Sequence, residues 1–222
     1  MKNNIIFVII FIAVVSAGIV SMIFLAKRGS SAVLAPKSEM AAVVTESQPP
    51  KEEEIPQANT EPLKELLKST EMDTDYFTLV LPPGWVKTSS GESLPFIITD
   101  STEKVTDEKA KEIAFRTGLS INSMPLGETS LSDYVETMKT SLIQGIPIIE
   151  ITKEEQVGIN GSAAHILEIE SIQKDIKFRT VLAIFTGKDN TVWAFSFNTL
   201  DDSWNGYKDV FHNITDSIVM KQ

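Results

Sequence analysis

The spacing of apolar residues divides the chain into three parts. Residues 5–26 form one apolar run without a charge. Residues 27–70 mix Pro, Ser, Thr, Glu, Gln and Ala and show no hydrophobic period. From Tyr76 onward, apolar residues return with periods near 2 and 3.6, which are typical of strands and helices. This pattern predicts a short tail at residues 1–4, a membrane segment, a stalk and one folded domain at residues 71–222.

The apolar run from Ile5 to Ala26 has the length of a membrane-spanning helix. Its 22 residues extend about 33 Å as a helix, close to the ~30 Å hydrocarbon core of a bilayer. A cleavable signal peptide is the alternative, because Val15-Ser16-Ala17 suits a cleavage site, yet the apolar run continues beyond it. Basic residues flank both ends of the run, so the positive-inside rule discriminates little. We expect an uncleaved anchor in the cytoplasmic membrane that exports the domain, as short-tailed N-terminal anchors usually do.

The composition of residues 27–70 predicts a disordered stalk. Such a segment cannot bury enough apolar surface to offset its chain entropy. A flexible chain of this length spans on the order of 30–35 Å. The stalk would therefore act as a tether between membrane and domain.

Alternation marks the first strands of the domain. Phe77, Leu79 and Leu81 share one face of a strand that stops at Pro82-Pro83-Gly84. Leu94 to Thr99 is a second apolar strand, and alternation from Ile113 to Ile121 predicts a third.

The period then changes to that of a helix. Apolar residues on one helical face recur at Leu131, Tyr134, Val135, Met138 and Leu142. Ser130 is the expected N-cap with Asp133 at the reciprocal position, and Gly145 followed by Pro147 ends the helix.

The remaining residues predict a run of hairpins and a closing helix. Strands resume at Ile148, and Asn160-Gly161 favours a tight hairpin turn. The later strands and the helix are expected at Ala163–Ile172, Val181–Phe185, Thr191–Asn198 and Trp204–Val219, with Asp201 or Asp202 as the helix cap. Val181–Phe185 is continuously apolar and is expected to be a central strand. An antiparallel meander flanked by helices defines the fold class as α+β.

The charge and the cysteine content limit the classes of partner and of chemistry that are open to the domain. The net charge is −10, and residues 71–222 hold 13 basic and 23 acidic side chains, so the whole imbalance lies on the domain. Such a surface is repelled by nucleic acid and by anionic lipid headgroups. The chain has no cysteine, which excludes disulfides and thiolate chemistry. We therefore expect no nucleic-acid partner.

Two histidines are the candidates for acid–base catalysis. The chain contains only His165, on a predicted strand, and His212, on the last predicted helix. We expect a partly buried His165 and a surface His212. A small hydrolase or lyase that uses His165 with a nearby serine or carboxylate is an alternative, although no nucleophile-elbow motif supports it.

The acidic clusters and the tryptophans could each form a binding site, but structural roles are favoured for both. Asp100 to Glu103, Asp107-Glu108 and Asp201-Asp202 lack the spacing of a calcium loop, so solvated loops and a helix cap are favoured over a divalent-cation site, which stays an alternative. Trp85, Trp193 and Trp204 are expected in the core rather than in a ligand platform. No catalytic, cofactor-binding or metal-binding residue is assigned.

The motifs together resemble the PsbP family and the wider Mog1/PsbP-like fold over residues 75–220. The similar segments include the opening YFTLVLPPGW, the hairpin segments VGINGSAAHILEIE and TVWAFSFNT, and the aromatic terminal helix. The resemblance implies an antiparallel sheet sandwiched by helices (an α/β/α sandwich) and a non-enzymatic, extracytoplasmic accessory role with a protein partner. Photosynthetic members assist photosystem II, so an associated role is a further alternative, although the anchor and acidic stalk depart from those members.

Overall fold

The computed structural model describes residues 69–88 and 95–221. The predicted transmembrane segment, residues 5–26, and the predicted stalk up to residue 68 lie outside this part. Among the described residues, none of the helices combines the length and the apolar character that a bilayer crossing needs. The described residues form an α+β fold with antiparallel sheets and few helices.

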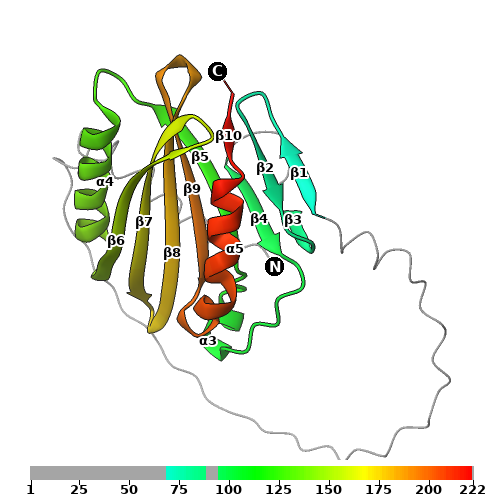
Figure 1. Ribbon diagram of the computed structural model, residues 1–222. Coiled ribbons are helices and arrows are strands. Elements are labelled where there is room, and N and C mark those ends of the chain that lie inside the picture. The colour runs from blue at the N-terminus through cyan, green and yellow to red at the C-terminus, as the bar shows by residue number, and fades with distance from the viewer. Residues whose placement is uncertain (1–68, 89–94, 222) are drawn as a thin grey trace, which may run out of the picture.

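A seven-stranded antiparallel sheet is the centre of the domain (Figure 1). Across the sheet, its strands are β3 (Trp85–Lys87), β4 (Phe96–Asp100), β5 (Gly118–Pro125), β9 (Thr191–Leu200), β8 (Ile176–Gly187), β7 (Ser162–Gln173) and β6 (Ile148–Ile159). The last four form the predicted meander, because each pairs with its neighbour in the chain. The expected hairpin turn is confirmed by positive φ angles of 47° at Asn160 and 83° at Gly161.

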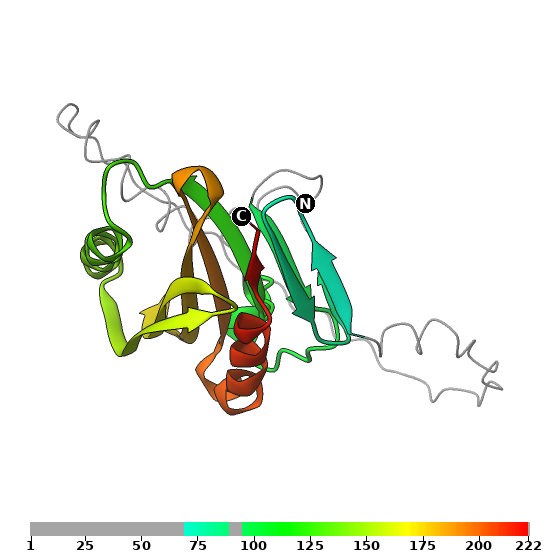
Figure 2. The same cartoon turned by 45° about the horizontal axis from the view of Figure 1, so that its top comes forward.

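A second, three-stranded sheet lies beside the first and was not predicted. Its strands are β1 (Thr70–Asp73), β2 (Phe77–Leu81) and β10 (Val219–Met220), with β2 in the middle. This small sheet and the last helix, α5 (Trp204–Asp216), lie on the same side of the large sheet (Figure 2).

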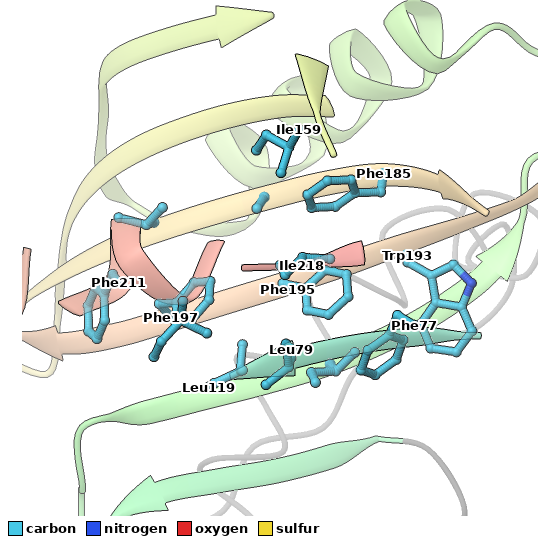
Figure 3. Packing of buried hydrophobic residues seen from close by; sticks show 14 of the residues in the cluster. Phe77, Leu79, Leu119, Ile159, Phe185, Trp193, Phe195, Phe197, Phe211 and Ile218 are labelled. Carbon is cyan, nitrogen blue, oxygen red and sulfur yellow. The ribbon is translucent and has the colours of Figure 1, made fainter. Parts of the chain in front are cut away.

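The larger hydrophobic core fills the space between these layers. Trp193, Phe195 and Phe197 of β9 point into it, as their alternation predicts, and Phe77 of β2 meets Trp193 and Phe195 edge-on (Figure 3). Phe211 of α5 packs on Phe197 with ring centroids 5.3 Å apart. We call the side of the large sheet that faces this core the α5 face.

The other side of the sheet, the α4 face, is covered by α4 (Leu131–Gly145). Ser130 caps this helix by accepting a hydrogen bond from the backbone N–H of Asp133, as predicted. Tyr134 and Leu142 are buried among residues of the second core cluster, and burial raises the pKa of Tyr134 to about 12. One helix therefore covers one face, and a helix with a small sheet covers the other.

The strand predicted from Ile113 to Ile121 is wrong in its first half. A short helix, α3 (Glu108–Glu112), precedes it, and Asp107 caps that helix by accepting from the N–H of Ala110. Ala114 then has φ 52°, and the strand β5 begins only at Gly118. The alternation was real, but a helix end and a turn produce part of it.

The end of the chain also differs from its prediction. Residues Asp201–Ser203 form a turn of 3₁₀ helix (η3), and no side chain caps α5, so the expected cap at Asp201 or Asp202 is wrong. Asp201 instead accepts a hydrogen bond from Arg179. The helix ends at Asp216, and Val219 belongs to β10. A second 3₁₀ turn, η2 (Lys188–Asn190), joins β8 to β9.

A β-bulge in β6 directs the β6–β7 hairpin toward α5. Ile151 pairs with Ile169 and Lys153 with Glu168, so Thr152 is the extra residue. The bulge shifts the alternation of β6 by one residue. As a result, Ile151 packs on the α4 face, whereas Ile159 reaches the core on the α5 face.

The tip of this hairpin is attached to the end of α5. The side-chain Nδ2 of Asn160 donates to the carbonyl oxygen of Asp216 at 2.9 Å and to that of Ile218 at 2.8 Å. Asp216 is the last residue of the helix and Ile218 lies just beyond it, where backbone acceptors lack intrahelical partners. One amide therefore joins two parts of the chain that are far apart in sequence.

We expect Asn160→Asp to lower the free energy of unfolding by about 1–3 kcal/mol, because the variant loses both donors and places a carboxylate against two carbonyls. Urea unfolding of the full chain in detergent measures the difference. Asn213→Asp adds the same charge to an exposed position in the last turn of α5 and is the matched control. Equal losses in the two variants would contradict this role of Asn160.

Candidate functional site

His165 lies on the α4 face of β7, in phase with Leu167 and Ile169. Only 5% of the residue is exposed, and its Nδ1 atom is buried without a hydrogen-bond partner. Burial lowers the pKa of His165 below its usual value of about 6.5, opposed in part by the nearby charge of Glu154. The imidazole is therefore neutral at physiological pH and can both donate and accept a hydrogen bond.

A hollow of about 440 Å³ opens beside His165 at the β6–β7 hairpin. Its lining is made mostly of small residues: Gly158, Gly161, Ser162, Ala163 and Ala164, together with Gln156, Val157 and His165. Because five of the eight lining residues are glycine, alanine or serine, the hollow results from the sequence of the hairpin itself. The hollow is shallow and widely open to solvent.

Charged residues border this region on the helix side. Lys139 of α4 binds Glu136 at 2.8 Å and Glu154 of β6 at 2.7 Å. Both carboxylates contribute to the electrostatic field at His165, and so does the Lys139 ammonium. The carboxylates nearest to the histidine are thus already engaged in ion pairs.

This geometry does not favour the alternative of a hydrolase or lyase that uses His165. Ser162 also lines the hollow, but its register opposite Ile159 places its side chain on the α5 face, away from the imidazole. Among the described residues, no serine or carboxylate makes a hydrogen bond to His165. A nucleophile–base pair of the kind that acyl transfer requires is therefore not assembled here.

His212 lies on the opposite side of the sheet from His165. It belongs to α5, and its Nε2 atom is 3.3 Å from Oε1 of Glu168 on β7. His212 is half-buried rather than a surface residue, which corrects the expectation from sequence. The large sheet separates the two histidines, so they cannot share a metal ion or a substrate.

Glu168 is the centre of an ion cluster that the sequence did not reveal. The residue is 7% exposed, and its Oε1 atom is buried without a hydrogen-bond partner. Lys208 is 3.7 Å away and Lys153 is 3.9 Å away. These two ammonium groups compensate the buried carboxylate, and together with His212 they join β6 and β7 to α5.

The loop after β4 is largely exposed at Ser101, Thr102, Asp107 and Glu108, as expected, whereas Asp100 is buried and Glu103 half-buried, and both bind protein donors. Asp100 accepts hydrogen bonds from the Tyr207 hydroxyl at 2.7 Å and from the N–H and hydroxyl of Thr102 at 2.7 and 2.6 Å. Glu103 accepts from the N–H and the hydroxyl of Thr117, both at 2.6 Å. These carboxylates are thus occupied by protein donors and anchor the loop after β4 to α5 and β5.

The geometry around these residues gives a divalent-cation site little support. Asp107 caps α3, and Asp201 binds Arg179. Within residues 69–88 and 95–221, no group of three or more His, Asp or Glu side chains converges in a way that could hold a metal ion.

The tryptophans have the structural positions that were expected. Trp85 and Trp193 are buried in the larger core, and Trp204 is half-buried against it. Trp204 lies beneath the guanidinium of Arg179 and the ammonium of Lys208, each within 6 Å of its ring centroid.

Comparison with solved structures supports the fold. The domain is similar to the cyanobacterial PsbP protein CyanoP of Synechocystis sp. PCC 6803, with a TM-score of 0.53, 16% identity and coverage of 70% of this chain and 94% of that chain. It is also similar to LpqN of Mycobacterium tuberculosis, described as involved in cell envelope biogenesis, with a TM-score of 0.52, 11% identity and coverage of 70% and 91%. The Ran-binding protein Mog1p of Saccharomyces cerevisiae is similar at a TM-score of 0.48 and 13% identity over 69% of this chain and 95% of that chain.

The fold is therefore PsbP-like, as the sequence motifs predicted. No family model matches the chain, and no curated protein matches its sequence. Identities this low establish the fold and not the activity.

Sequence reasoning missed two features of the site. It placed strands on both sides of Asn160-Gly161 but did not use the small residues around them, which leave the hollow. It also did not single out Glu168. The signal for Glu168 was a charged residue within the apolar run Ile166–Ile169, which predicts a buried charge with compensating partners.

Removal of the Tyr207 hydroxyl should destabilise the domain. Burial and then the hydrogen bond to Asp100 raise the pKa of Tyr207, which indicates an enclosed neutral phenol. Tyr207→Phe leaves Asp100 without this donor, so we expect a loss of about 1–3 kcal/mol in urea unfolding. Tyr76→Phe, at a residue that is 43% exposed, is the control and should change stability by less than about 0.5 kcal/mol. A Tyr207→Phe loss as small as the control would contradict the network.

His165 should make stability depend on pH with a defined sign. Because its pKa is lowered in the folded state, the unfolded chain takes up a proton first as the pH falls below about 6.5. The stabilisation by the neutral imidazole is complete above that pH and is lost as the pH falls toward the folded-state value. We expect the free energy of unfolding of the wild type to fall more steeply between pH 7.5 and 5.5 than that of His165→Gln. His212→Gln should keep the part of this fall that is due to His165. Identical pH profiles of the free energy of unfolding for wild type and His165→Gln would contradict the role of His165.

Proposed function

We propose that the chain is a membrane-tethered, non-catalytic accessory or binding module that acts on a protein partner at the outer face of the cytoplasmic membrane. Residues 5–26 would hold it in the bilayer, and residues 27–70 would let the domain move within the membrane-proximal layer.

One observation carries the proposal. The side chains that could take part in acid–base chemistry lie at three separate places. These are His165 on the α4 face, Glu168 with His212 on the α5 face, and Asp100 with Tyr207 beside α5. A catalytic site needs a nucleophile, base and orienting group in mutual contact. The long exposed strand β6 offers a binding surface instead.

Charge and tether length support the same proposal. The acidic domain is repelled by anionic headgroups, and this repulsion is screened beyond about 8 Å at physiological salt. A flexible stalk that spans on the order of 30–35 Å would let the domain lie beyond that range while keeping it near other membrane proteins. The envelope role described for LpqN, which shares the fold, is compatible with such a position.

Chemical crosslinking in native membranes, followed by purification of the full chain, tests the proposal. We expect one recurrent protein partner with the full chain, and loss of most of that yield with a variant that lacks residues 1–26 and is released from the membrane. Protease cleavage of the stalk on intact cells should occur without lysis. No recurrent partner across several growth conditions, or a stalk that is protected in intact cells, would contradict it.

A further inference from the structure

The outer edge of β6 is the long open edge of the large sheet. β6 is the terminal strand in the sheet order, and no described strand pairs with its outer side. It has 12 residues, whereas β3 at the opposite edge has three. Most β6 side chains are exposed, and Ile148 at its start is 56% exposed although it is apolar. An edge of this length provides backbone donors and acceptors for an additional strand.

The charges on β6 select the kind of strand that can pair. Glu150, Glu154 and Glu155 are acidic and Lys153 is the one basic residue, so the strand carries a net charge of −2. Glu154 pairs with Lys139 of α4 at 2.7 Å and Glu155 with Lys153 at 2.9 Å, so among the described residues Glu150 is the β6 carboxylate left to attract a cation. The bulge at Thr152 and these charges disfavour indiscriminate pairing. A second antiparallel copy of β6 would bring this acidic segment against itself. A strand with Lys or Arg would meet opposite charges.

The hollow lies at the turn end of the same edge, and residues from both faces of the hairpin line it. Gln156 of β6 lies opposite His165, and Gly158 lies opposite Ala163, so these pairs form two rows across the hairpin. A strand added outside β6 would extend both rows, and its side chain beside Gly158 would lean over the hollow. A Cβ atom added at Gly158 would meet no atom within 4 Å, so this place is open. Pockets for alternate side chains are what gives strand addition its specificity.

The polarity of the residues that line the hollow indicates which side chain it receives. His165 is buried, and its Nδ1 atom has no partner. None of the residues that line the hollow is charged, and the neutral imidazole supplies no compensating charge. An uncharged side chain, apolar or with a hydroxyl or amide, therefore suits it better than a charged one.

We propose that the outer edge of β6 binds an extended segment of the protein partner that carries Lys or Arg residues, adds to the sheet as a further strand, and places one uncharged side chain in the hollow beside His165. An apolar residue near the end of the segment would cover Ile148. This inference rests on the proposed binding function and specifies the chemistry of the partner.

The test uses the full chain in detergent micelles and two capped peptides of about ten residues. One peptide alternates Thr or Val with Lys, and the other has Glu in place of each Lys. At low salt, we expect the Lys peptide to bind about tenfold more tightly than the Glu peptide. Its binding should slow amide hydrogen exchange in Ile148–Ile159 and leave β1 unchanged.

Two variants locate the contact. Glu150→Lys should weaken binding of the Lys peptide by about threefold to tenfold and strengthen binding of the Glu peptide. Gly158→Phe should fill the hollow and weaken binding of both peptides. Glu71→Lys makes the same charge change on the exposed edge strand β1 and is the matched control, with an effect of about twofold or less.

Several results would overturn the proposal. These are no binding of either peptide, binding without protection of β6, or an equal effect of Glu150→Lys and Glu71→Lys. Protection of β6 before peptide is added would also overturn it, because the edge would then be taken by a second copy or by another segment of this chain. If crosslinking still recovers a partner while the peptides fail, the binding function stands and the assignment to β6 falls.

Discussion

Burial of both faces of the central strands is the constraint on which the structure depends. β8 and β9 are covered by α4 on one side and by the larger core on the other, so their apolar residues run almost without interruption. Consecutive antiparallel pairing from β6 to β9 then fixes the order of strands. β9 pairs with β5 in the interior of the sheet, and β6, where the meander begins, becomes the edge. The open strand of the domain is thus a consequence of how its core is buried.

The same arrangement explains where the polar side chains are placed. A residue on β7 must face either α4 or α5, so His165 and Glu168, three positions apart, lie on opposite sides of the sheet. Each buried charge is compensated locally: Glu168 by cations of α5 and β6, and Asp100 by hydroxyl and N–H donors. The buried polar groups of the domain thus stabilise contacts between its layers. The outer edge of β6 is left without a partner strand among the described residues.

Sequence patterns predicted the parts of the fold that depend on local periodicity. The helix capped by Ser130 and the turn at Asn160-Gly161 were placed correctly, because a cap and a positive φ need particular residue types. The strand expected from Ile113 failed because α3 and a turn imitate alternation over a few residues. The small sheet was missed because β10 has only two residues. The hollow and the Glu168 cluster depend on cross-strand register, which a single sequence does not specify.

The central claim is that, in the full chain anchored in native membranes, a protein partner covers the outer edge of β6. Because the chain has no cysteine, single substitutions report on chosen positions without interference. Glu150→Cys and Glu71→Cys should react with a maleimide at similar rates in the purified chain. In native membranes, the account predicts that Glu150→Cys reacts several-fold more slowly, whereas Glu71→Cys is unchanged. Equal rates at both positions in native membranes would contradict it.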